Sequence, residues 1–380
     1  MILENQAHLY ELDPSHCYLN CAYFSPQLKS VTEIGIKSLL KKSTPWSMPV
    51  SDFYEPVEDC RKVISKLVGC SMDNVALSPS VSYSLALASK NIRLERGSKI
   101  LLLEEQFPSN VYVWLQKAKD EELEVEFVSH GKSWTESILQ RLSDSNDIGL
   151  IALGQVHWTD GEWIDLVQIS RICKKKGIVL VVDATQSMGA CPFPYDEIQP
   201  DFLAVGGYKW LQGPYGMGFV VVADKYLEGS PLEWNWINRS DSENFHSLVD
   251  YRETYQSGAR RFDLGGKSQF ILVPMFTKAL EQVLSWGVEN IAETLRDYNQ
   301  SLHEGIHHLG LRTQDSSFRS PHLLGIYERG RQFREGLAEY LKENKVHVSF
   351  RGSSIRVSPY LYNSSQDKER FLEVLEGALS

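Results

Sequence analysis

The chain has 380 residues, 42% of them hydrophobic and 23% charged, a composition typical of a globular enzyme, and its formal net charge is −10 at pH 7. The length is enough for one large core and a smaller second domain, while the acidic balance argues against nucleic acid as the main partner. No apolar run approaches the roughly 18 residues of a membrane-spanning helix. The acidic N-terminus also lacks the pattern of a secretory signal, so we expect a cytoplasmic enzyme without a membrane partner.

The six cysteines are scattered at positions 17, 21, 60, 70, 173 and 191. Cys17 and Cys21 have a CxxxC spacing, but no second pair of ligands accompanies them, which argues against a zinc site. We therefore expect reduced thiols and no metal.

The first quarter of the chain predicts a short strand and then helix. Residues 16–26, HCYLNCAYFSP, are apolar and break at Ser-Pro. Residues 27–70 have apolar positions at helix-like intervals and end at Gly69. In residues 75–92, a strand-like VAL meets a Ser-Pro-Ser turn that opens an amphipathic helix. Such a turn offers free backbone N–H groups to a phosphate, although a plain serine N-cap is the alternative.

Alternating strand and helix patterns follow. Residues 99–115 read as a buried strand, a polar turn and a helix, and residues 148–166 as a strand and a loop before a helix that runs to Lys176. Between Ile178 and Val222, three short runs (IVLVV, FLAV and FVVV) have the β-branched content and lack of polar alternation typical of strands buried on both faces. This order predicts an α/β fold.

Two polar side chains follow the first two of these runs. Asp183 stands at the end of IVLVV, and Lys209 follows FLAV after Gly206-Gly207-Tyr208. Ligands of open α/β sheets bind outside the carboxyl ends of the strands, so one ligand can meet both residues. A lysine and a buried carboxylate suit pyridoxal 5'-phosphate, whose aldehyde needs a Schiff-base lysine and whose ring nitrogen must stay protonated. Gln186, three residues after Asp183, can form a hydrogen bond with the ring hydroxyl. Taken singly, Asp183 is more often a helix cap and Lys209 a solvated residue.

The last third predicts a second, smaller domain. Residues 226–268 are rich in loops and aromatic residues, 270–309 are helical, and the strand-like HLLGIYE and VHVSFRG flank a helix at 331–343. We expect a large domain at 26–268 and a small α+β domain at 269–380, with residues 1–25 as an arm or part of the small domain. Arg356, in SSIRVSPYLYNS, precedes a Ser-Pro turn, where its guanidinium can hold a carboxylate with two parallel hydrogen bonds.

The segment VVDATQS…DFLAVGGYKWLQGPYGMGF resembles the cofactor segment of class V aminotransferase-fold enzymes, a group that includes cysteine desulfurases, kynureninases and isopenicillin N epimerase-like proteins. The resemblance extends over most of the chain. It implies fold-type I architecture, which is a mostly parallel seven-stranded sheet flanked by helices with a small α+β C-terminal domain.

The resemblance also implies roles for further residues. Near the cofactor, it assigns the phosphate-binding turn to Ser80 and Val81 and the ring-stacking role to Phe107. It places His157 and Trp158 by the ring substituents, and it lets the hydroxyl of Tyr208 donate to the phosphate. His157 is either a proton carrier or a packed loop histidine. The region near Gly258 and Ala259 would reach the phosphate of a partner, making the enzyme an obligate homodimer with shared sites. Arg356 would hold the α-carboxylate of an amino-acid substrate.

The expected chemistry begins with removal of the α-proton by Lys209, which leaves a carbanion stabilised by the cofactor. Lyase, transaminase and epimerase reactions share this intermediate, and we favour a lyase such as one that cleaves a C–S bond. No cysteine follows Cys191, which argues against the persulfide chemistry of desulfurases. A degenerate relative that only binds is disfavoured by the retention of Asp183, Gln186, Lys209 and Arg356. A nucleotide-binding α/β protein is disfavoured because no GxGxxG or GxxxxGK[ST] motif follows a strand.

Overall fold

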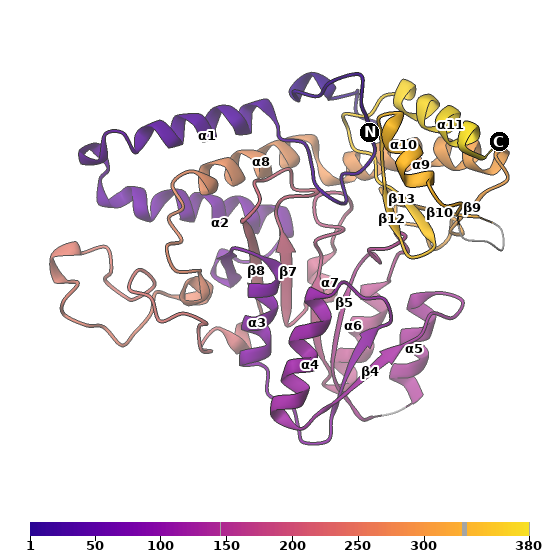
Figure 1. The fold of residues 1–380 in the computed structure, drawn as a ribbon. Coiled ribbons are helices and arrows are strands. Elements are labelled where there is room, and N and C mark those ends of the chain that lie inside the picture. The colour runs from indigo at the N-terminus through magenta and orange to yellow at the C-terminus, as the bar shows by residue number, and fades with distance from the viewer. Residues whose placement is uncertain (145, 329–332, 380) are drawn as a thin grey trace.

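A seven-stranded sheet forms the centre of the computed structural model, which describes residues 1–144, 146–328 and 333–379 (Figure 1). Six of its strands are parallel, and β8 runs antiparallel to both of its neighbours. The predicted mostly parallel sheet of fold-type I is therefore confirmed. The order across the sheet is β2 (Val75–Ser78), β8 (Gly218–Val222), β7 (Phe202–Gly206), β6 (Val179–Asp183), β5 (Ile148–Gly154), β3 (Lys99–Leu103) and β4 (Glu124–Val128).

Helices cover both faces of this sheet, which explains why its central strands lack polar alternation. In β6, Leu180 and Val182 face one apolar cluster, while Val179 and Val181 face the other. The first cluster also contains side chains of α2 (Glu55–Val68), α5 (Trp134–Asp144), α6 (Leu166–Lys176) and α8 (Leu272–Trp286). The second contains α3 (Val81–Asn91) and α4 (Ser109–Glu121). The short α7 (Tyr195–Ile198) precedes β7.

The stretch predicted to be helical at 27–70 is interrupted. It forms α1 (Lys29–Lys41) and α2, separated by the 3-10 turns Pro45–Ser47 and Val50–Phe53. Proline cannot donate a backbone hydrogen bond and disfavours helix at the preceding residue, so Pro45 and Pro49 break the run. The end at Gly69 is confirmed, since this residue has the left-handed φ of 78° that favours glycine. The strand predicted within 16–26 shrinks to β1 (Cys17–Tyr18).

A four-stranded antiparallel sheet lies in the C-terminal part of the chain, in the order β12 (Ser349–Arg351), β13 (Ser354–Val357), β10 (Leu324–Tyr327) and β9 (Arg312–Thr313). Its helices are α9 (Val288–His308), α10 (Leu337–Glu343) and α11 (Ser365–Leu379). Positions 331 and 332 of the predicted helix lie outside the described residues. The N-terminal β1 pairs in parallel with β11 (Val346–His347), so both chain termini lie near this sheet (Figure 1).

The segment between β8 and α8 extends away from the central sheet as a long series of loops (Figure 1). Its regular structure consists of the 3-10 turns Asp224–Tyr226, Phe245–Ser247 and Gly258–Phe262. No helix in the described part of the chain is both long and apolar enough to cross a membrane.

Candidate functional site

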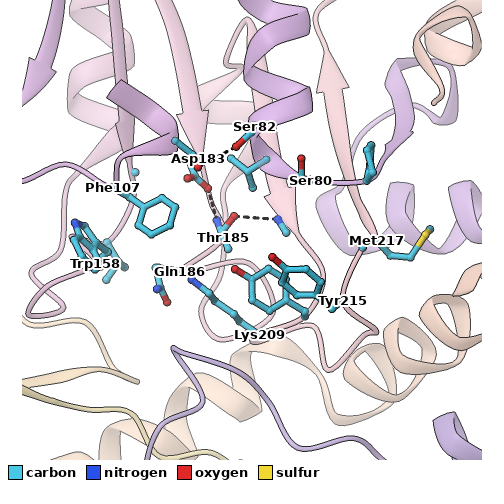
Figure 2. Close-up of a pocket in the computed structure, with 18 of the residues that line it drawn as sticks. Ser80, Ser82, Phe107, Trp158, Asp183, Thr185, Gln186, Lys209, Tyr215 and Met217 are labelled. Carbon is cyan, nitrogen blue, oxygen red and sulfur yellow. Dashed lines mark hydrogen bonds between the residues drawn. The ribbon is translucent and has the colours of Figure 1, made fainter. Parts of the chain in front are cut away.

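A pocket lies at the carboxyl ends of the central strands (Figure 2). The last residues of β5, β6 and β7, which are Gly154, Asp183 and Gly206, all line it. The pocket also brings together most of the residues predicted from the sequence: Ser80, Val81, Phe107, Trp158, Asp183, Gln186, Tyr208 and Lys209. The topology thus places side chains from distant parts of the sequence at one edge of the sheet, as the ligand rule for open α/β sheets predicts.

Asp183 is held by the turn that follows it. The backbone N–H of Thr185 donates to Asp183 Oδ1 at 3.0 Å, and Thr185 Oγ1 accepts from the Gly206 N–H at 3.0 Å, which joins the ends of β6 and β7. Burial raises the pKa of the Asp183 carboxyl, while Thr185 and the charge of Lys209 act in the opposite direction. A cationic partner in the pocket would favour the carboxylate form.

Lys209 is buried, with an exposed fraction of 6%. The pKa of its amine is lowered to about 8, mainly by burial and also by the positive charges of Arg356 and Arg351, against the opposing effect of Asp183. The amine lies 5.6 Å from the ring centre of Phe107. A buried amine with this pKa is available as a nucleophile or base near neutral pH.

Gln186 has a fixed orientation in the pocket wall. Its Oε1 accepts from Trp210 Nε1 at 3.0 Å, and its Nε2 donates to the Ala22 carbonyl at 3.2 Å. An amide nitrogen carries two hydrogens, so one N–H remains for a ligand oxygen. Phe107 and Trp158 meet edge to face at 5.3 Å and form the neighbouring wall.

The N-terminus of α3 forms the opposite end of the pocket. Ser80 Oγ accepts from the Tyr83 N–H at 3.2 Å, so the serine N-cap is real. The first-turn N–H groups of Val81 and Ser82 have no intrahelical acceptor and remain suited to an anion. Ser82 also donates its hydroxyl to Ser109 Oγ at 3.0 Å.

Three predicted site residues do not line this pocket. His157 lines a separate cavity with Trp134, and its Nδ1 lies 2.8 Å from Thr159 Oγ1. Ala259 is buried against the sheet face that α3 and α4 cover. Arg356 is also buried, and its Nη1 donates to the carbonyl of the pocket residue Trp158 at 2.7 Å.

Several pocket residues were missed by the sequence analysis. Thr185 lies between Asp183 and Gln186, in the motif already singled out, and its position there was the available signal. Tyr215 gave no signal, because only the folded turn before β8 brings its ring within 4.7 Å of that of Tyr208.

Gly207, the second of the two glycines before Lys209, has a packing role. A Cβ on Gly207 would lie 2.5 Å from Phe276 of α8 and 2.8 Å from the Met217 carbonyl. The missing side chain thus allows α8 to pack directly under the lysine turn.

The pKa of Lys209 leads to a testable pH dependence. Attachment of an aldehyde requires the neutral amine, so the rate of cofactor loading should rise about tenfold per pH unit below 8 and level off above it. The growth of visible absorbance in cofactor-free protein measures this rate. Replacing Arg356 with glutamine should move the midpoint upward, because a lowering charge is lost. A midpoint near the ordinary lysine value of 10.5 in the unaltered protein would contradict the assignment.

Comparisons with a family model and with curated proteins point to the same family, and comparison with solved structures points to the same fold. The model of the family "Aminotransferase class-V" matches residues 46–371. An uncharacterised aminotransferase of Bacillus subtilis is 28% identical to this chain, in an alignment that covers 88% of this chain and 86% of the relative. A probable cysteine desulfurase of Pyrococcus abyssi is 24% identical, in an alignment that covers 84% of this chain and 82% of the relative. The solved cysteine desulfurase of Thermococcus onnurineus superimposes with a TM-score of 0.85 at 18% identity, covering 99% of both chains.

Proposed function

The chain belongs to the aminotransferase class-V family and is a pyridoxal-phosphate-dependent enzyme, and from this premise we propose that it is a lyase that removes the α-proton of an amino acid and then cleaves a bond at Cβ. The observation that carries the α-proton step of this proposal is the convergence of Asp183 and Lys209 on adjacent strand ends, with the Arg356 guanidinium behind the pocket wall.

The residues of the pocket fit the cofactor. We assign the protonated ring nitrogen to Asp183, the ring hydroxyl to the remaining N–H of Gln186, and the phosphate to the N-terminus of α3. Phe107 supplies a ring for stacking, and Lys209 supplies the amine for the covalent link. Bound pyridoxal phosphate supplies an electron sink for negative charge that develops at the substrate Cα.

Different side chains of the protein bind the substrate, accept its α-proton and limit the access of water. Arg356 orients the substrate through its α-carboxylate, which fixes the direction of the Cα–H bond. Lys209 takes the α-proton, and its lowered pKa keeps it neutral often enough to act as a base. Trp158 and Phe107 limit the access of water on one side.

The relative named a probable cysteine desulfurase supports cleavage at Cβ, whereas the relative named an uncharacterised aminotransferase supports amino transfer as the alternative. Storage of sulfur on a cysteine of this chain is not part of the proposal, since no cysteine among the described residues lines the pocket. Cys21 lies beneath Lys209, with its Sγ 4.0 Å from the Lys209 carbonyl, and burial raises the pKa of this thiol to about 12. The six free thiols suit a reducing compartment, and we include cytoplasmic location in the proposal.

The experiment is a product screen of the holoenzyme with amino acids that carry a leaving group at Cβ. We expect release of the leaving group and formation of ammonia and a keto acid, with the cofactor unchanged. A screen that yields a keto acid and aminated cofactor in equal amounts would instead show a transaminase.

We also propose a homodimer with shared sites, supported by large apolar side chains left exposed in one chain. Trp46 is 83% exposed, Trp234 70% and Tyr251 91%, and Tyr215, which lines the pocket, is 67% exposed. Light scattering should give twice the chain mass of 43.3 kDa. Tyr251→Asp should lower that mass and weaken cofactor retention together, whereas a single-chain mass for the unaltered protein would contradict the dimer.

A further inference from the structure

Two arginines share one face of the β12–β13 hairpin beside the pocket. Arg356 pairs with Ser349, and Arg351 stands two residues further along β12. Side chains two apart on a strand point to the same face, so Arg351 and Arg356 are diagonal cross-strand neighbours, roughly 7–8 Å apart at their backbones. Like charges at such a position repel, so the arrangement calls for an anion.

Neither arginine has a carboxylate partner among the described residues. Arg356 Nη1 donates to the Trp158 carbonyl at 2.7 Å, and Arg351 Nη1 donates to the carbonyl of its neighbour Phe350 at 2.8 Å. The Nε atoms of both guanidiniums are buried and have no hydrogen-bond partner in the described structure. Buried donors of a charged group are costly to leave unpaired.

Neither guanidinium lines the pocket itself, but both contact Trp158, which forms part of its wall. Trp158 lines the pocket, offers its carbonyl to Arg356 and holds Arg351 over its ring at 5.4 Å. Ser354, from the same face of the hairpin, donates to the Thr159 carbonyl at 3.2 Å and ties the hairpin to this loop. Both positive charges also lower the pKa of Lys209, which places them within electrostatic reach of the reacting centre.

Acidic groups near Arg351 do not neutralise it. Arg351 also lines the separate cavity of His157, together with Glu104, Glu105 and Asp160. Asp160 accepts from the Tyr327 hydroxyl at 2.9 Å, and Glu104 accepts from Ser129 at 2.8 Å. None of these carboxylates lies within ion-pair distance of Arg351 in the described part of the chain.

We propose that the substrate is an amino acid whose side chain ends in an anionic group, a carboxylate or a sulfonate, which Arg351 binds while Arg356 binds the α-carboxylate. The inference rests on the proposed function, because it takes the pocket to be the substrate site. Arg351 acts as a specificity-determining residue: it recognises the far end of the side chain and leaves the bonds at Cα to Lys209.

The test measures binding without turnover. The 2-methyl derivatives of aspartate, asparagine, glutamate and glutamine have no α-proton, and calorimetry with the holoenzyme gives the affinity of each. We expect each acid to bind at least about tenfold more tightly than its amide, as expected for a charge-assisted pair. In Arg351→Ala this preference should fall to about one, and Arg351→Lys should keep part of it. The matched control is Arg312→Ala, an exposed arginine of the same small sheet, which should keep the full preference.

A fifth compound, 2-methylalanine, separates the possible failures. If it binds but the acids show no advantage over the amides, or if the advantage survives in Arg351→Ala, this inference is overturned and the proposed function stands. If none of the five compounds binds, the proposed function falls with it.

Discussion

Replacing Lys209 with alanine will remove the visible absorbance band of the holoenzyme and lower turnover at least about 10³-fold. Both effects follow from the position of the amine, which is buried in the pocket with a pKa lowered to about 8. Loss of a positioned proton-transfer group alone costs about 10²–10⁴-fold, and the covalent link to the cofactor is lost as well. Absorbance spectra and product formation measure the two losses separately.

Borohydride reduction gives the assignment a second readout. In the unaltered protein, reduction should fix the cofactor to the peptide that contains Lys209, as mass spectrometry would show. Lys209→Arg keeps the charge but should show no label, whereas the surface control Lys225→Ala should keep both label and turnover. A label that persists in Lys209→Ala would place the attachment elsewhere.

Replacing Asp183 with asparagine should leave cofactor attachment intact and lower turnover about 10²–10³-fold, the range measured when one preorganised electrostatic contact is removed from a site. A neutral amide cannot favour the protonated ring nitrogen as a carboxylate does. Because Thr185 holds the carboxylate by its backbone N–H, the amide can take the same position. The loss should therefore appear in the chemical step, with the substrate KM little changed.

A structural carboxylate on the same sheet provides the control. Asp201 precedes β7 at the opposite end of the strand, where it accepts from the Leu180 N–H at 2.8 Å. Asp201→Asn should lower thermal stability without changing turnover per folded holoenzyme. Equal losses of turnover in the two variants would mean that Asp183 acts only through stability.

The central strands and the two polar residues at their ends could be predicted because their signals are local. A strand buried on both faces needs an unbroken apolar run, and the runs before Asp183 and Lys209 end abruptly. The α3 turn was visible for the same reason, since a serine N-cap belongs to the sequence just before the helix.

The features that could not be predicted from the sequence depend either on long-range packing or on local signals that compete with each other. The apolar spacing across 27–70 predicts one helical stretch, but Pro45 and Pro49 interrupt it with two 3-10 turns. His157 and Trp158 are adjacent in sequence, yet only Trp158 lines the cofactor pocket. No sequence periodicity in an irregular loop shows which of two neighbours points inward. The placement of Arg351 and Arg356 on the same face of the hairpin likewise depends on the register of the two strands.

The pairing of β1 with β11 bears on the order in which the molecule is made. Cys17 aligns with Val346, and the same N-terminal segment supplies the Ala22 carbonyl that fixes Gln186. During synthesis at roughly 5–20 residues per second, this segment waits on the order of tens of seconds for its partner strand to leave the ribosome. Asp183 and Lys209 can come together well before then. In a nascent chain, Asp183 and Lys209 are thus made well before Arg356, the residue assigned to the substrate carboxylate.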